Sequence, residues 1–203
     1  GSGVLAAGHG GREAAIGARV VSKREFAGYW EYMLEEAIFT SPAHPNWGGT
    51  ALIGQDGKLL GIGSLYVEDA ADTSDGDDSR NGNMFVPIDL LTPILDEMLS
   101  EGRTAASHRP WMGLFTAEVE GGVEVIGLAQ DGPAERSGLQ LGDAIVKVNG
   151  TAIASMAELY RRAWSSGAAG VDIKMTVLRE TYAFELTVKS EDRYTRLKFQ
   201  RQF

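Results

Sequence analysis

Apolar residues in the first hundred positions gather in short runs, and glycine-rich or polar turns separate these runs. Short runs of aliphatic and aromatic residues between turns predict β-strands. Asp56-Gly57 lies between two of the runs and is a strong signal for a hairpin turn. Strand-forming residues are therefore found at 4–8, 14–22, 28–40, 50–54, 59–67 and 83–88.

A helical period replaces the strand pattern in two places. Asp89 is a suitable N-cap for the first helix, which has one apolar stripe and Gly102 after its end. Ser155 is the expected N-cap of the second, with Glu158 at the capping-box position. Helices are predicted over 89–102 and 155–167.

The second half of the chain is separated from the first by a short polar segment that ends in proline, which is typical of a linker. Short strands then alternate with glycine turns, including Asn149-Gly150, and 171–190 is predicted to form a closing hairpin. The expected organisation is a domain at 1–103, a linker at 104–110, a domain at 111–190 and a basic tail at 191–203.

Composition narrows the classes of function. The 203 residues include 28 acidic and 19 basic side chains, a net charge of −9, which argues against nucleic acid as a partner. The sequence contains no run of 18 apolar residues, so no membrane-spanning helix is predicted. The absence of cysteine excludes disulfides, thiolate metal sites and cysteine nucleophiles.

A glycine-rich segment and an acidic segment are each a candidate binding site, the first for phosphate and the second for calcium. Gly8, Gly10 and Gly11 are not followed by the lysine motif of a phosphate-binding loop, so a strand-to-strand turn is expected there. The acidic segment 67–83 is interpreted as a solvated loop, because neither Asp72 nor Asp75 begins the residue pattern of a calcium-binding loop. Neither a cofactor nor a metal is expected.

The second half resembles the PDZ domain of HtrA-type proteins. The segment "GPAERSGLQLGDAIVKVNGTAI", residues 132–153, matches that family nearly residue for residue. In it, Gly132-Pro133 leads into a short helix, Gly138 caps the helix, and Gly142-Asp143 makes a tight turn before a strand.

The first half resembles the second β-barrel of an HtrA-like, trypsin-related serine protease. The resemblance rests on "GSGVLAAGHGG", "ARVVSKRE", "TSPAHPNWGGTALIGQDGKLLGIGSL" and "NMFVPIDLLTPILDEML", in that order. It implies a mainly β fold: the C-terminal half of a chymotrypsin-like barrel protease domain, then a PDZ domain with α/β elements. The first barrel, which bears the triad histidine and aspartate in such proteases, has no counterpart in this sequence. The resemblance also implies a periplasmic or cell-envelope location.

The loop that is catalytic in this family is degenerate here. By resemblance, Trp47 occupies the position of the nucleophilic serine, and an indole has no nucleophilic oxygen. Pro45 occupies the position of an oxyanion-hole donor and has no N–H to donate. Asn46 lies between these two residues. Gly48 and Gly49 follow, and their presence is explained if the chain turns there with positive φ angles, which glycine adopts most easily. The interpretation of Trp47 is that it fills the vacated pocket.

Replacement catalytic groups are not apparent in the sequence. His44 and Ser41 lie beside the loop and could form a dyad, but a histidine followed by proline is more typical of a turn. Ser64, His9 and His108 are single residues with no partner visible along the chain. Because such sites assemble in space, the sequence does not exclude a new one.

The PDZ half predicts a groove for peptide C-termini. Such domains bind an extended peptide at a strand edge and hold its terminal carboxylate in a nest of backbone N–H groups. By resemblance, "WMGLF" is the carboxylate loop and the 155–167 helix is the opposite wall, although its apolar stripe is also its core face. The implied binding residues are Trp111, Met112, Gly113, Leu114, Phe115, Thr116, Met156, Leu159, Tyr160 and Ala163.

Three functions remain open. The first is a protease-like barrel without catalysis, joined to a PDZ domain that binds proteins ending in a hydrophobic residue. The second is an active serine endopeptidase whose site is completed by a missing barrel or a partner. The third is a structural module that self-associates through the groove or an exposed barrel face.

The basic tail suggests an internal ligand. It ends in Phe203, and a free carboxylate on a large apolar residue suits this type of groove. The alternative is a solvated terminus, or one held on the acidic surface.

Overall fold

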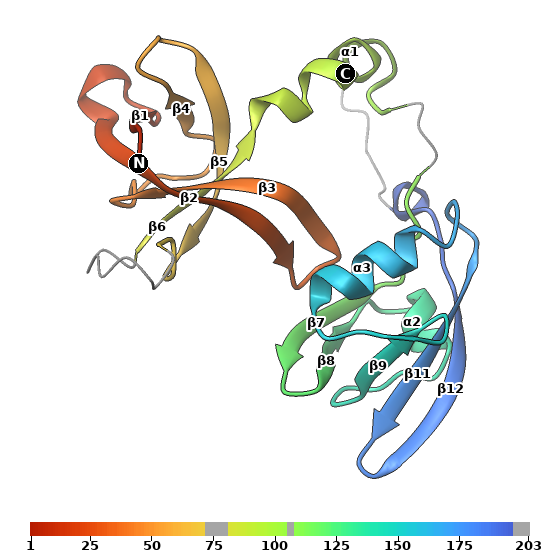
Figure 1. Cartoon of the computed structure of the whole chain (residues 1–203). Coiled ribbons are helices and arrows are strands. Elements are labelled where there is room, and N and C mark those ends of the chain that lie inside the picture. The colour runs from red at the N-terminus through yellow and green to blue at the C-terminus, as the bar shows by residue number, and fades with distance from the viewer. Residues whose placement is uncertain (72–80, 105–107, 197–203) are drawn as a thin grey trace. The chain divides into compact units, whose positions relative to one another are not determined.

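The computed structural model describes residues 1–71, 81–104 and 108–196. The chain forms two compact units, one of Gly1–Phe26 with Leu34–Ala105 and one of Ala27–Met33 with Ala106–Phe203 (Figure 1). Most of the acidic segment, with Asp72 and Asp75, lies outside the described residues, as do part of the linker and the end of the tail with Phe203.

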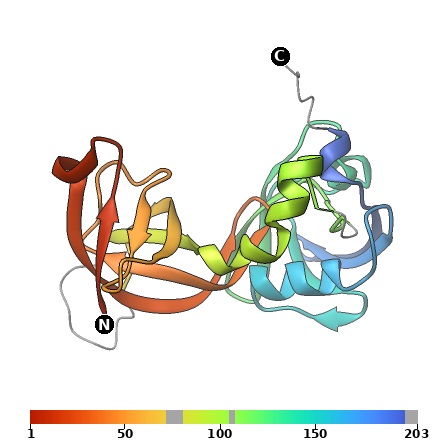
Figure 2. The ribbon, with the colours of Figure 1, turned by 90° about the horizontal axis from the view of Figure 1, so that it is seen from above.

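The first unit is a closed antiparallel barrel, and its strands wrap around one another in Figure 1 and Figure 2. Its order is β1-β2-β3-β6-β5-β4, and β4 pairs back with β1. The core consists of Val4, Ala6, Ala18, Ile38, Leu52 and Phe85. The strands are β1 (Gly3–Ala7), β2 (Ala15–Gly28), β3 (Tyr32–Ser41), β4 (Ala51–Ile53), β5 (Leu59–Val67) and β6 (Gly82–Pro87).

The predicted strands are confirmed with one exception. A 3-10 turn, η1 (Gly11–Ala14), joins the first two strands, and Gly57 turns the β4–β5 hairpin with a φ of 79°. The expectation of strand over 28–40 is wrong at its start, because β2 ends at Gly28 and β3 begins at Tyr32. The reversal ends in Glu31 with a φ of 57°, a left-handed conformation that a strand does not contain.

The first predicted helix is mostly wrong. Instead of one helix from Asp89, the segment forms η3 (Ile88–Leu90), η4 (Thr92–Ile94) and the α-helix α1 (Leu95–Glu101). Pro93 is the cause, since it has no N–H and disfavours helical backbone in the residue before it. Gly102 ends α1 with a φ of 70°, as expected.

The second unit contains a sheet of order β12-β11-β9-β8-β7, with β10 paired to β9. Its closing hairpin is confirmed as β11 paired with β12. The elements are β7 (Leu114–Val119), β8 (Gly122–Leu128), α2 (Pro133–Arg136), β9 (Ala144–Val148), β10 (Thr151–Ala152), α3 (Met156–Trp164), β11 (Asp172–Arg179), β12 (Tyr182–Lys189) and η5 (Arg193–Thr195).

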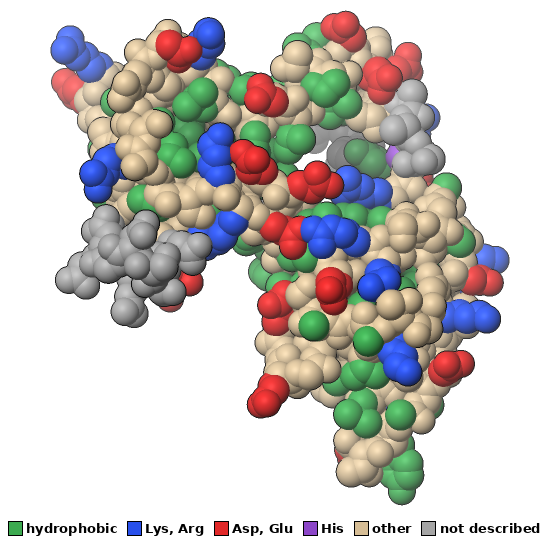
Figure 3. All heavy atoms as spheres, viewed as in Figure 1, with side chains coloured by type: hydrophobic (Ala, Val, Ile, Leu, Met, Phe, Trp, Pro, Cys, Tyr) green, Lys and Arg blue, Asp and Glu red, His purple; other side chains and the backbone are tan. Residues whose placement is uncertain are grey.

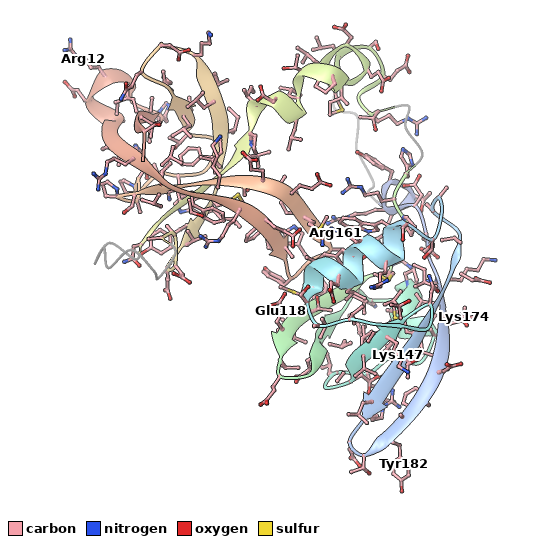
Figure 4. All side chains as sticks on the ribbon, in the orientation of Figure 1. Arg12, Glu118, Lys147, Arg161, Lys174 and Tyr182 are labelled. Carbon is pink, nitrogen blue, oxygen red and sulfur yellow. The ribbon has the colours of Figure 1, made fainter. Side chains whose placement is uncertain are left out.

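Helix α3 is the predicted second helix, and its capping is confirmed. The Ser155 hydroxyl accepts a hydrogen bond from the Glu158 N–H at 3.2 Å. The Glu158 carboxylate accepts one from the Ala154 N–H at 2.7 Å. Glu118 of β7 reaches the first turn, where its carboxylate accepts from the Met156 N–H at 2.9 Å (Figure 4). The start of α3 is therefore fixed on the edge of β7.

Two surface properties bear on function. Acidic and basic side chains are interspersed over the face drawn in Figure 3, without one large basic patch. In the part of the chain that the structure describes, no helix has the length and apolar character needed to cross a bilayer.

The turn before β9 is fixed by a buried ion pair. The Asp143 side chain is 0% exposed, and the Arg179 side chain that covers it is 33% exposed. Asp143 accepts hydrogen bonds from Arg179 Nε at 2.6 Å, from Arg179 Nη2 at 2.8 Å and from the Gln140 N–H at 2.8 Å. Burial alone would raise the pKa of Asp143, but Arg179 and the Gln140 N–H hold it below its ordinary value.

Replacing Asp143 with Asn is expected to lower the free energy of unfolding by about 2 kcal/mol, because the carboxylate loses its charge-assisted hydrogen bonds with the partly exposed Arg179. Because the folded pKa of Asp143 is lowered, its contribution is present above the ordinary pKa of about 3.9 and is lost as the pH falls further. Urea unfolding at pH 7 and pH 3 measures both effects. Asp172→Asn, at an exposed position of β11, is the control; equal losses in the two variants would contradict this account.

Candidate functional site

The degenerate loop joins β3 to β4 and is held by backbone hydrogen bonds. The Gly49 N–H donates to the Gly63 carbonyl at 2.9 Å, and the Thr50 N–H donates to the Trp47 carbonyl at 3.1 Å. A side chain at Gly63 would place its Cβ 2.1 Å from the Trp47 oxygen, so only glycine fits there. The loop keeps a tightly packed backbone around a residue with no reactive oxygen.

The glycines and the tryptophan of this loop fit the expectations only in part. Gly49 has a φ of 75°, as expected, but the same expectation is wrong for Gly48, whose φ is not positive. Trp47 is half-buried, whereas Pro45 and Asn46 are exposed. The indole is therefore only partly enclosed.

His44 is a structural residue in this loop. It is 2% exposed, and its Nδ1 accepts a hydrogen bond from the Asn46 N–H at 3.0 Å. Its Nε2 therefore carries the proton and donates to the Ala14 carbonyl at 2.7 Å. The Ser41 hydroxyl donates to the Asn81 carbonyl at 3.1 Å. Because backbone groups engage both ring nitrogens, His44 has no free nitrogen with which to deprotonate Ser41.

The other single residues lie apart from the loop chemistry. His9 is exposed in the turn after β1, and Ser64 is half-buried in β5. His108 pairs through Nδ1 with Asp192 in the second unit. Across the described ranges, no three His, Cys, Asp or Glu residues are grouped so as to hold a metal ion.

The predicted carboxylate loop of the second unit directs three backbone N–H groups to one point. Trp111 is anchored by two backbone hydrogen bonds with Glu191, both at 2.9 Å. Gly113 turns the chain with a φ of 79°, and a Cβ there would lie 3.2 Å from the Ala129 Cβ. As a result, the N–H groups of Met112, Gly113 and Leu114 form an anion nest at the start of β7.

A carboxylate from the chain itself occupies this nest. The Glu31 Oε1 accepts hydrogen bonds from the Gly113 N–H at 2.6 Å and the Leu114 N–H at 2.8 Å. Its Oε2 accepts one from the Met112 N–H at 2.9 Å. Glu31 is only 8% exposed. It belongs to the turn between β2 and β3, and this turn, 27–33, is part of the second unit; we call it the tip segment.

The tip segment also contacts both walls of the groove. On the strand side, the Thr116 N–H of β7 donates to the Tyr29 carbonyl at 2.9 Å. On the helix side, the Tyr160 hydroxyl of α3 donates to the Gly28 carbonyl at 2.8 Å and accepts from the Glu31 N–H at 3.3 Å. The segment is thus held between β7 and α3 by backbone groups.

The expected groove residues divide between these contacts and the core. Thr116 Oγ1 lies 3.0 Å from the Tyr160 hydroxyl, and the Phe115 ring centroid lies 6.1 Å from that of Tyr29. Met156 Sδ lies 4.0 Å from the Tyr160 hydroxyl. Leu159 and Ala163, by contrast, are 0% exposed and belong to the core cluster of this unit.

Sequence reasoning missed Glu31, Tyr29 and Gly28. Each lies in what looked like a strand, and no spacing motif marks a glutamate whose partners come 81 to 83 residues later in the chain. The only local signal is Gly28 beside two aromatic residues, which does not predict a carboxylate in a distant nest.

Burial changes the acid chemistry of the nest. It raises the pKa of Glu31 to about 7, against the opposing effect of the three N–H donors and the charge of Arg193 in η5. Burial also raises the pKa of Tyr160, which faces Glu31 from α3. The carboxyl that fills the nest therefore titrates close to neutrality.

Comparisons with known proteins agree with this architecture. Residues 110–190 match the PDZ domain family. The chain is 26% identical over 155 residues to the serine protease Do-like HtrA of Bacillus subtilis, covering 67% of this chain and 32% of the relative. It is 30% identical over 118 residues to the serine endoprotease DegS of Escherichia coli, covering 52% of this chain and 31% of the relative.

Solved structures show the same fold. The structure described as the HtrA-type protease AlgW with decapeptide has a TM-score of 0.56 at 23% identity, covering 95% of this chain and 61% of that chain. The two units thus define a trypsin-related barrel followed by a PDZ domain. The chain is similar to HtrA-like serine proteases, and it spans about a third of the length of the curated relatives it matches.

The Glu31 carboxyl is expected to titrate with a midpoint near pH 7, where an exposed glutamate titrates near 4.3. The pKa of Glu31 is raised when the tip segment is docked, so the protonated carboxyl docks more favourably than the ionised one. Docking is therefore strongest below about pH 4.3, weakens as the pH rises, and reaches its weakest level above about pH 7. The amide resonances of Met112, Gly113 and Leu114 report this titration by NMR. A midpoint near 4.3 at all three amides would contradict it.

Proposed function

We propose that this chain is a peptide-binding member of the HtrA-like family whose barrel does not cleave peptide bonds. The observation that carries the proposal is the convergence of three backbone N–H groups, from Met112 to Leu114, on one carboxylate. Such a nest beside an open strand edge is how a groove recognises the end of a polypeptide. The glutamate that it holds stands in for a terminal carboxylate.

The groove favours ligands with an apolar residue next to the carboxylate. Ala27 and Met33 of the tip segment are half-buried and pack against the core cluster of the second unit. Tyr29 places its ring beside Phe115 of β7. Apolar side chains therefore have a surface to cover there, which supports a peptide or protein ending in a hydrophobic residue as the partner.

The barrel lacks the chemistry of acyl transfer. Trp47 offers no nucleophile, and Pro45 offers no oxyanion-hole N–H. Both ring nitrogens of His44, the histidine beside the loop, form hydrogen bonds with backbone groups. An active endopeptidase would need a nucleophile, a base and an oxyanion donor other than Trp47, His44 and Pro45.

The location that fits this proposal is the bacterial cell envelope. The Pseudomonas putida relative, 26% identical over 153 residues, is named a probable periplasmic serine endoprotease. Because the alignment covers 29% of that relative, its protease activity and its compartment are carried to this chain only as proposals.

Binding is expected to require the free carboxylate of the ligand. A ten-residue peptide ending in Phe should bind at least about tenfold more tightly than its C-terminally amidated twin, because the amide removes the charge that the nest receives. Isothermal titration calorimetry with both peptides measures the ratio. Equal affinities would show that the nest is not used for ligands.

The chain is expected neither to degrade casein nor to react with a fluorophosphonate probe. Trp47→Ser alone should not restore activity, because Pro45 still lacks an N–H and losing one oxyanion donor costs about 100-fold to 1000-fold in rate. Mass spectrometry after probe treatment checks for labelling. Stoichiometric labelling of a serine in the unaltered chain would favour the active endopeptidase instead.

A further inference from the structure

The tip segment binds in the groove as a peptide would, although it is an internal turn. Its Tyr29 carbonyl accepts the Thr116 N–H of β7, which is a backbone bond of the kind that a strand added to a sheet edge makes. Two residues later, the Glu31 side chain delivers a carboxylate to the nest. Strand-edge pairing followed by a carboxylate is the arrangement that a peptide end supplies.

Glu31 has a left-handed backbone conformation, as Glu180 has in the β11–β12 turn, but only Glu31 places its carboxylate in a nest. A φ of 57° is unfavourable for a residue with a side chain, and tight turns normally place Gly or Asn there. A glutamate at this position does not help the turn itself. Its carboxylate gains three N–H donors, and its own N–H is bonded to the Tyr160 hydroxyl.

We propose that the tip segment is an internal competitor of the PDZ groove: Glu31 fills the carboxylate nest in the free chain, and a peptide C-terminus binds by displacing it. This inference rests on the proposed function of the groove as a site for peptide ends. It adds that the groove is closed by default and that the hairpin joining β2 and β3 is its occupant.

The contact is suited to displacement. Burial raises the pKa of Glu31 to about 7, so ionisation of this carboxyl near neutral pH weakens its docking in the nest. Arg193 of η5 and Tyr160 of α3 are the charged and titratable groups acting on it. The docked tip segment is therefore easiest to displace at and above neutral pH.

Hydrogen exchange tests the occupancy without any ligand. Glu31→Ala should make the amides of Met112, Gly113 and Leu114 exchange at least about tenfold faster, because they lose their acceptor. The Thr116 amide should also exchange faster, since it is bonded to Tyr29 and not to Glu31. Glu35→Ala, an exposed glutamate on the same hairpin, is the control and should change none of the four.

A second pair of variants separates loss of the contact from misfolding. Glu31→Gln keeps the size of the side chain and removes its charge, and Glu31→Gly suits the left-handed backbone. Glu31→Gly should keep the circular dichroism spectrum and thermal transition of the parent chain while its nest amides exchange faster. Glu31→Gln is neutral like the protonated carboxyl, so it should retain more protection at the nest than Glu31→Gly. Unchanged exchange in both Glu31→Ala and Glu31→Gly would overturn the proposal.

Competition is tested by calorimetry with the ten-residue peptide ending in Phe. Glu31→Ala should bind it about tenfold more tightly than the parent chain, as expected if the groove is open in about a tenth of the molecules. Glu35→Ala should bind it like the parent. Faster exchange with unchanged affinity would mean that Glu31 does not compete, and the proposal would be wrong. If no variant binds the peptide, the proposed function fails, and the exchange result still decides whether Glu31 fills the nest.

Discussion

Three backbone N–H groups pointing at one carboxylate are the constraint around which the second unit is arranged. An N–H group buried without an acceptor is costly, so a nest of three must be filled by an anion or by water. The left-handed Gly113, the pairing of Trp111 with Glu191 and the packing of α3 all serve to hold these donors in place. In this chain the anion is Glu31, a residue of the hairpin between β2 and β3.

The geometry of the loop between β3 and β4 depends on the backbone of the first unit. The barrel closes, Gly63 still allows the close approach of the Trp47 carbonyl, and Gly49 still turns the loop. These features depend on backbone geometry, which does not require a serine or a free histidine. Strands β2 and β3 connect the barrel to the tip segment, which belongs to the second unit.

The sequence was informative wherever the structure depends on local pattern. Alternating apolar runs with Asp56-Gly57 predict the barrel strands, and Ser155 with Glu158 predicts the start of α3. It failed where one residue overrides a pattern, as Pro93 does in dividing the predicted helix. It also failed where a contact joins residues far apart in the chain, because no periodicity or spacing links Glu31 to Gly113.

The account is tested most directly by the titration of the Glu31 carboxyl, followed through its side-chain carbon in a selectively labelled chain. Without ligand, the pKa should lie near 7, because the carboxyl is buried in the nest. With a saturating peptide that ends in Phe, it should return towards the ordinary value of about 4.3, because the carboxyl is released to solvent. A pKa that stays near 7 while the peptide is bound would show that the two do not share the nest, and would contradict the account.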